Sequence, residues 1–150
     1  MLVSDIMTRT PRTVSLDAKL QEVASIMCLY RIPALPVVDE DGKLVGNISE
    51  MDLLKSLFPT MEDIMAGDAA LEIGRMMSNY SASMEQRVSD MMVKNPVSVS
   101  PDQHVLKATA KMTSHRFRRI PVIDGDGKLV GVMSLGDVHK AVFQSHVSEG

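Results

Sequence analysis

The sequence predicts an α/β (α+β) fold of two β-α-β-β-α units, related by a pseudo-twofold axis, with small, mostly antiparallel sheets and packed helices. The first observation is an internal repeat: residues 3–58 and 88–143 align without gaps at an offset of 85, and 23 of the 56 paired positions are identical. The second is an apolar stripe at helical spacing in each copy, and the third is an Asp-Gly pair between two apolar runs. Two copies are too few for a solenoid, so we expect a pair of units that share one core.

Each copy opens with a short segment, VSDIM or VSDMM, followed by a proline and an extended stretch at residues 12–15 and 97–100. An amphipathic helix is expected next, because apolar residues recur at i, i+3, i+4, i+7 and i+8. In the second copy, Ser100-Pro101-Asp102-Gln103 predicts the helix start, with Ser as N-cap, Pro at N1 and Gln at N3. The stripe consists of Leu20, Val23, Ala24, Met27 and Cys28 in the first copy and Val105, Ala108, Thr109, Met112 and Thr113 in the second.

Two strands and a second helix complete each copy. Apolar runs at residues 35–38 and 120–123 precede Asp41-Gly42 and Asp126-Gly127, a pair that favours a tight hairpin. The returning strands are expected at 44–48 and 129–133, and the closing helices at 50–58 and 135–143. The sequence thus defines a first motif at residues 1–58 and a second at 88–150. Residues 59–87 form a Met-rich, acidic connector, which we expect to be partly helical, broken near Gly67 and mobile around 78–83.

Composition narrows the class of protein. The 150 residues carry 16 basic and 19 acidic side chains, and only 3% are aromatic, which disfavours a nucleic-acid-binding surface. No apolar run is long enough to span a bilayer, and the N-terminus lacks the pattern of a signal peptide, so we expect a cytoplasmic protein without a membrane partner. The single cysteine, Cys28, falls in the helical stripe and is expected to be a small core residue.

Both copies carry the same motif, G-x-h-S-x-x-D with h apolar, where a strand turns into a helix. It contains Ser49 and Asp52 in the first copy and Ser134 and Asp137 in the second. One interpretation is a helix cap, with Ser as N-cap and Asp near the positive end of the helix dipole. The other is a nucleotide site, in which the hydroxyl and the helix start bind phosphate and the carboxylate accepts hydrogen bonds from a ribose diol.

Other chemistry is not indicated. The four histidines show no metal-ligand spacing, and neither motif serine has an evident partner base, so we expect no enzyme, no metal and no required cofactor. The acidic turn at residues 39–42 lacks the later Glu of a calcium loop and is interpreted as a hairpin.

The two phrases PVVDEDGKLVGNISEMD and PVIDGDGKLVGVMSLGD, with the preceding helix and the DIM or DMM lead-in, resemble tandem CBS domains, a pair called a Bateman module. The resemblance covers all but the connector and the last few residues. It implies two β-α-β-β-α units and the sensing of adenosine-containing ligands such as AMP, ADP, ATP, S-adenosylmethionine or NAD. It also implies a homodimer formed through the helices, and a protein effector that reads the ligand state.

The resemblance further implies two clefts, each shared between the copies. One site would use Asp137 and Ser134 with Thr13, Ile32 and Pro33, and the other Asp52 and Ser49 with Ser98, Phe117, Arg118 and Arg119. The basic run at residues 115–119 is either a solvated helix C-terminus, where the dipole favours cations, or a phosphate contact by Arg118 or Arg119. In the second case the site on Asp52 would prefer the more phosphorylated ligand. The leading hypothesis is a stand-alone regulatory module without catalysis, and the alternative is a ligand-free dimerisation scaffold.

Overall fold

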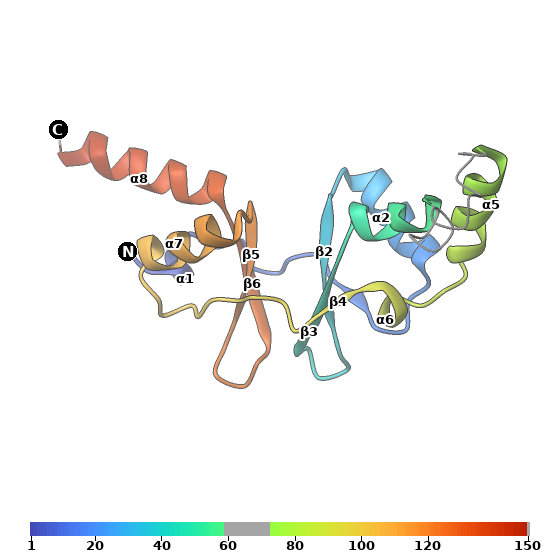
Figure 1. The fold of residues 1–150 in the computed structure, drawn as a ribbon. Coiled ribbons are helices and arrows are strands. Elements are labelled where there is room, and N and C mark those ends of the chain that lie inside the picture. The colour runs from blue at the N-terminus through green and yellow to red at the C-terminus, as the bar shows by residue number, and fades with distance from the viewer. Residues whose placement is uncertain (59–72, 150) are drawn as a thin grey trace. The chain divides into compact units, whose positions relative to one another are not determined.

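The computed structural model describes residues 1–58 and 73–149 and divides the chain into two compact units (Figure 1). Unit 1 comprises Met1–Arg12, Val38–Leu44 and Asn95–Gly150, and unit 2 comprises Thr13–Val37 and Val45–Lys94. Neither unit coincides with one sequence repeat. The lead-in segment of each repeat belongs to the unit that contains most of the other repeat.

Unit 2 is built around a four-stranded sheet in the order β1-β2-β3-β4. Strands β3 and β4 are antiparallel, with Gly46 opposite Lys94 and Asn47 opposite Val93. The elements are β1 (Val14–Ser15), α2 (Leu20–Tyr30), β2 (Ala34–Val38), β3 (Leu44–Ser49), α3 (Glu50–Leu54), the 3-10 helix η1 (Lys55–Leu57), α5 (Ile73–Ser83), α6 (Val88–Met91) and β4 (Val93–Lys94).

Unit 1 repeats this arrangement around the antiparallel pair β5-β6. Thr8 forms an antiparallel bridge with Val132, and Val99 a parallel bridge with Val122, so the two flanking positions that are strands in unit 2 are single bridges here. The extended stretch predicted at 97–100 therefore contributes one bridge and no strand. The elements are α1 (Val3–Ile6), α7 (Val105–His115), β5 (Arg119–Ile123), β6 (Leu129–Ser134) and α8 (Leu135–Glu149).

The exchanged segments are tied into their units by equivalent backbone hydrogen bonds. In unit 1 the Val3 N–H donates to the Gln103 carbonyl at 2.9 Å, and in unit 2 the Val88 N–H donates to the Ala18 carbonyl at 2.8 Å. Val3 and Val88 are completely buried. The short lead-in helices thus complete the core of the unit built from the other repeat.

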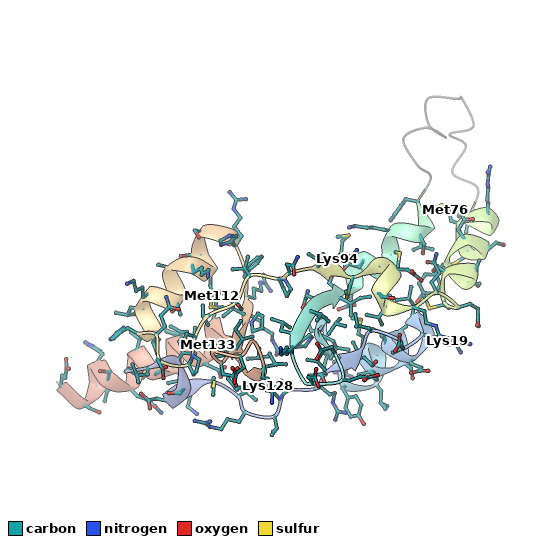
Figure 2. The ribbon with its side chains drawn as sticks, turned by 90° about the horizontal axis from the view of Figure 1, so that it is seen from below. Lys19, Met76, Lys94, Met112, Lys128 and Met133 are labelled. Atoms are coloured by element: carbon teal, nitrogen blue, oxygen red, sulfur yellow. The ribbon has the colours of Figure 1, made fainter. Side chains whose placement is uncertain are left out.

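The expectation of one shared core is wrong, because each unit has its own apolar core, and the predicted helical stripes supply much of both. Leu20, Val23 and Met27 are buried in unit 2. In unit 1 the side chains of Met112 on α7 and Met133 on β6 belong to the same buried cluster (Figure 2). The stripe residues Val105 and Ala108 are buried with them.

The expectation for Cys28 is wrong, because its side chain is exposed. Burial on α2 centres on Leu20, Val23 and Met27. One further residue rotates the side chain by about 100° around the helix, which carries position 28 to the edge of the stripe.

The predicted start of the second stripe helix is also wrong. Helix α7 begins at Val105, and its N-cap is His104, whose Nδ1 accepts a hydrogen bond from the Leu106 N–H at 3.1 Å. Residues 101–103 form a turn instead, with the Gln103 N–H donating to the Ser100 carbonyl at 3.2 Å. The carbonyls of this turn accept hydrogen bonds from the first residues of α1, a contact that the local sequence does not show.

The closing helices differ in length although the repeats align without gaps. In the first copy α3 ends at Leu54 and tightens into η1, which ends at Leu57. In the second copy α8 continues to Glu149, beyond the predicted end at residue 143. The repeat alignment carries no sign of this difference.

Residues 73–87 of the connector are described, and Ile73–Ser83 of them form helix α5. The predicted mobile stretch at 78–83 is wrong, because it lies in α5, whose Ser83 is buried with its Oγ 3.0 Å from the Oγ of Ser56. Tyr80 and Met84 pack on the core of unit 2 and hold this helix in place. The predicted break near Gly67 lies outside the described residues.

Gly131 and Gly46 are required by the close approach of the exchanged segments. A Cβ at Gly131 would lie 2.7 Å from the Met7 sulfur and 2.8 Å from the Thr8 carbonyl oxygen. A Cβ at Gly46 would meet Met92 and lie 3.1 Å from the Val93 carbonyl oxygen. A backbone oxygen cannot move aside without disturbing its bridge, so a side chain here displaces the lead-in segment.

We therefore expect Gly131→Ala to lower the free energy of unfolding by about 1–3 kcal/mol, the usual cost of overpacking. Gly125→Ala is the matched control, because a Cβ at that position meets nothing within 4 Å, and its effect should stay within about 0.5 kcal/mol. Urea unfolding of both variants followed by circular dichroism measures the difference. Equal effects of the two substitutions would contradict this account of the crossing.

The exchange also predicts which fragment folds. Residues 13–94 contain the whole core of unit 2, whereas residues 1–58 lack Met84 and Val88, two buried side chains worth about 2 kcal/mol each. That loss is a large share of the roughly 5–15 kcal/mol that stabilises a domain. Thermal melts of the two fragments should show a cooperative transition for 13–94 only. A cooperative melt of 1–58 would show that a sequence repeat folds alone.

Candidate functional site

In unit 2 the motif Ser49 and Asp52 form a reciprocal cap at the start of α3. The Ser49 N–H donates to Asp52 Oδ2 at 2.9 Å, and the Asp52 N–H donates to Ser49 Oγ at 3.3 Å. The Ser49 hydroxyl also donates to Asp52 Oδ2 at 3.0 Å. Asp52 is only 4% exposed, so its charge is compensated by these bonds and by Lys55, whose Nζ lies 3.4 Å from Oδ1.

In unit 1 Ser134 and Asp137 repeat the cap at the start of α8. The Ser134 N–H donates to Asp137 Oδ2, and the Asp137 N–H to Ser134 Oγ, both at 3.0 Å. The helix-cap interpretation is therefore confirmed in both copies. Asp137 is more accessible than Asp52, because it is half-buried rather than buried.

The segment after each stripe helix lies against the cap of the same repeat. Arg31 ends α2 in the left-handed conformation at φ 54°, which turns the chain toward Pro33. The Pro33 carbonyl accepts a hydrogen bond from the Glu50 N–H at 2.9 Å. With the two cap bonds, this satisfies three of the four N–H groups that a helix start leaves unpaired.

The second repeat does the same with a more basic segment. Arg116 ends α7 at φ 59°, and the Arg118 carbonyl accepts from the Leu135 N–H at 2.9 Å. The structure thus places Pro33 beside Ser49 and Asp52, and Arg118 beside Ser134 and Asp137. Sequence reasoning missed this proximity within each repeat, which arises from the left-handed turn at the end of the stripe helix.

The two candidate residues on the extended stretches lie in different units. Thr13 is exposed and directly precedes β1 in unit 2. Ser98 is half-buried in unit 1, and its carbonyl accepts a hydrogen bond from the Lys111 Nζ at 2.8 Å. Each group of residues assigned by resemblance draws on both units, so both groupings stay predictions.

The basic run of unit 1 is exposed and partly ordered by stacking. The ring of His115 stacks on Phe117 with centroids 5.1 Å apart, and its Nδ1 lies 2.9 Å from the Lys111 carbonyl. Arg118 and Arg119 are exposed, and within the described part of the chain neither forms an ion pair. Their guanidinium groups therefore have no carboxylate partner there that an anion would have to displace.

Among residues 1–58 and 73–149, no three His, Cys, Asp or Glu side chains are grouped so that they could hold a metal ion. In the same residues, no helix has the length and apolar character needed to cross a membrane.

Comparison with known proteins identifies the family. The CBS domain model matches residues 3–59 and 88–144, and the chain belongs to this family. It is 30% identical to an uncharacterised protein of Methanocaldococcus jannaschii, MJ1426, over 95% of this chain and 92% of that protein.

Two solved structures share its fold and contain adenosine compounds. One is Arabidopsis thaliana CBSX2 in complex with AMP, at 26% identity and a TM-score of 0.73, covering 97% of this chain and 98% of that one. The other is the CBS domain pair of protein MJ0100 with 5′-methylthioadenosine and S-adenosyl-L-methionine, at 26% identity, a TM-score of 0.70 and the same coverage.

These likenesses confirm the predicted fold class and the family resemblance. They support a nucleotide-binding regulatory module as the class of protein. The cytoplasmic location stays a prediction, since CBSX2 is a chloroplast protein.

Proposed function

We propose that this chain is a regulatory module that binds an adenosine-containing ligand and signals by a change of conformation, without catalysis of its own. The observation that carries the proposal is that both copies keep a complete Ser and Asp pair at a strand-to-helix turn, in a chain similar to CBS pairs that hold AMP, methylthioadenosine or S-adenosylmethionine. The ligand is AMP, ADP or ATP, or S-adenosylmethionine or NAD.

The roles follow from the chemistry of each group. A carboxylate such as Asp137 accepts two hydrogen bonds from the vicinal hydroxyls of a ribose, and a serine hydroxyl donates to a phosphate oxygen. Guanidinium groups such as those of Arg118 and Arg119 add charge-assisted bonds to phosphates. The proposed sites comprise Asp137 and Ser134 with Thr13, Ile32 and Pro33, and Asp52 and Ser49 with Ser98, Phe117, Arg118 and Arg119.

Signalling requires that the ligand bind two arrangements of the chain with different affinity, because a ligand shifts an equilibrium only by that difference. An effector protein or a second copy of the chain would read the shift. The proposal assigns this coupling to ligand contacts that draw on residues of both copies of the repeat.

A ligand-free dimerisation scaffold is the second candidate. The completed caps favour it, because Ser49, Asp52, Ser134 and Asp137 already have a structural use without any ligand. Under this alternative the motif persists only because it stabilises the start of α3 and α8, by about 1 kcal/mol for each cap.

We expect AMP and ATP to raise the melting temperature of the wild type, since a ligand at 100 times its Kd stabilises a protein by about 2.7 kcal/mol. In calorimetric titrations Asp52→Ala and Asp137→Ala should each remove binding at one of the two sites. Asp52→Ala should weaken the binding of ATP more than that of AMP. Because both substitutions also remove a cap, each ligand-induced shift is compared with the melt of the same variant without ligand.

Asp126→Ala is the control, because this exposed carboxylate lies in the β5-β6 turn and its side chain makes no hydrogen bond in the described chain. It should leave both titrations unchanged. No shift with AMP, ATP, S-adenosylmethionine or NAD would favour the scaffold. If both aspartate variants lose AMP binding and ATP binding to the same extent, the proposed preference of the Asp52 site for the more phosphorylated ligand is contradicted.

We also propose that the chain forms a homodimer through its helices. Helix α8 supports this, because Phe143 and Val147, one turn apart, are each 58% exposed. In unit 2, Met51 on α3 is 66% exposed and Phe58 after η1 is 56% exposed. Exposed apolar side chains grouped on helices are typical of interaction surfaces.

Light scattering should give a mass of twice 16.4 kDa for the wild type. Phe143→Glu places a charge on the proposed contact and should yield the monomer. Asp126→Lys is the control, since Asp126 is an exposed residue of the β5-β6 turn outside the helices, and it should remain dimeric. A wild-type monomer at micromolar concentration, or a dimer that persists in Phe143→Glu, would contradict the proposal.

A further inference from the structure

The two copies share a longer pattern than the cap, S-x-x-D-x-x-K, but use its lysine differently. In the first copy it comprises Ser49, Asp52 and Lys55, and in the second Ser134, Asp137 and Lys140. Both carboxylate oxygens of Asp52 are engaged: Oδ2 accepts from the N–H and hydroxyl of Ser49, and Oδ1 lies 3.4 Å from the Lys55 Nζ.

The second copy leaves its aspartate less occupied. Asp137 Oδ2 accepts from the Ser134 N–H at 3.0 Å, and the Ser134 hydroxyl oxygen is the acceptor for the Asp137 N–H. Within the described part of the chain no ion pair joins Lys140 to Asp137. Asp137 is half-buried and Asp52 is 4% exposed, so the two carboxylates differ in access as well as in partners.

The two helices also continue differently after the motif. Asp52 lies in α3, and the Lys55 N–H still donates to the Met51 carbonyl four residues back, so the two side chains are neighbours on one face of a helical turn. Helix α8 stays α-helical through Lys140, yet among the described residues Lys140 forms no ion pair with the Asp137 carboxylate. The repeat thus encodes the same three residues and produces two different carboxylate environments.

We infer that Lys55 is an affinity-determining residue that competes with ligand for Asp52, so that an adenosine ligand fills the site on Asp137 first. This inference rests on the proposed function. Ribose hydroxyls that bind Asp52 Oδ1 must displace the lysine, whereas those that bind Asp137 displace no cation. Duplicated motifs with equal residues thereby become a high-affinity and a low-affinity site.

The size of the effect follows from the geometry of the pair. The Lys55 side chain is 64% exposed, and exposed ion pairs contribute little, so its competition should weaken the Asp52 site by about two- to fivefold. Salt screens exposed charges, so the difference attributable to Lys55 should narrow as ionic strength rises.

The test isolates each site and removes each lysine in turn. Adenosine is the probe, because it presents the ribose diol without a phosphate, so loss of a lysine cannot weaken binding through a phosphate contact. In the Asp137→Ala background, Lys55→Met should raise the adenosine affinity by about two- to fivefold by calorimetric titration. In the Asp52→Ala background, the matched change Lys140→Met should leave it unchanged.

The outcomes separate this inference from the proposed function. Adenosine binding that is unchanged or weakened by Lys55→Met, or raised equally by Lys140→Met, would overturn the inference alone. If the wild type binds neither adenosine nor AMP, the proposed function and the inference fail together. If the double variants do not fold, Lys55→Met is tested in the otherwise wild-type chain, where it must bring the adenosine affinities of the two sites closer together. An unchanged ratio of these two affinities would overturn the inference.

Discussion

The structure depends on a backbone crossing that occurs once in each unit. The segment after each lead-in helix passes close to the second hairpin strand of the other repeat: a Cβ at Gly131 would lie 2.8 Å from the Thr8 carbonyl oxygen, and one at Gly46 would meet the Met92 side chain. The crossing pairs Val93 with Asn47 and Thr8 with Val132, positions related by the repeat offset of 85. It places Val3 of the first repeat in the core of unit 1, which the second repeat mainly forms, and Val88 of the second repeat in the core of unit 2. Because each unit is completed by the other copy, the repeat is a unit of sequence and not a unit of folding.

The same constraint places the candidate ligand groups. Each hairpin strand that pairs with a crossing segment continues directly into a capped helix. The Ser and Asp of the motif therefore follow a strand that is paired on one side with its hairpin partner and on the other with the crossing segment. The cap bonds orient the carboxylate, with Oδ2 turned toward the serine N–H. A carboxylate oriented before binding loses less entropy when it accepts hydrogen bonds from a ligand. Cap and ligand site are therefore compatible uses of one pair of residues, and the cap alone does not decide between a sensor and a scaffold.

Duplication supplies two equal motifs, and the surroundings make them unequal. The Lys55 Nζ lies 3.4 Å from Asp52 Oδ1, and α5 packs against the following 3-10 helix through Ser83 and Ser56. The second closing helix runs on to Glu149, and among the described residues Lys140 forms no ion pair with Asp137. The basic segment with Arg118 and Arg119 exists in one copy only, where the first copy has Pro33 and Ala34. The two sites can therefore differ although their serine and aspartate residues are the same.

The sequence by itself determined the features that local periodicity and turn chemistry encode. These are the buried stripe of Leu20, Val23 and Met27, the two hairpins and the Ser and Asp caps, each set by residues within a few positions of one another. Only the tertiary structure decided the exchange of lead-in segments and the start of α7 at Val105. Both depend on hydrogen bonds between residues far apart in the chain. A gapless repeat shows which residues are equivalent, but it carries no information about which copy each segment packs against.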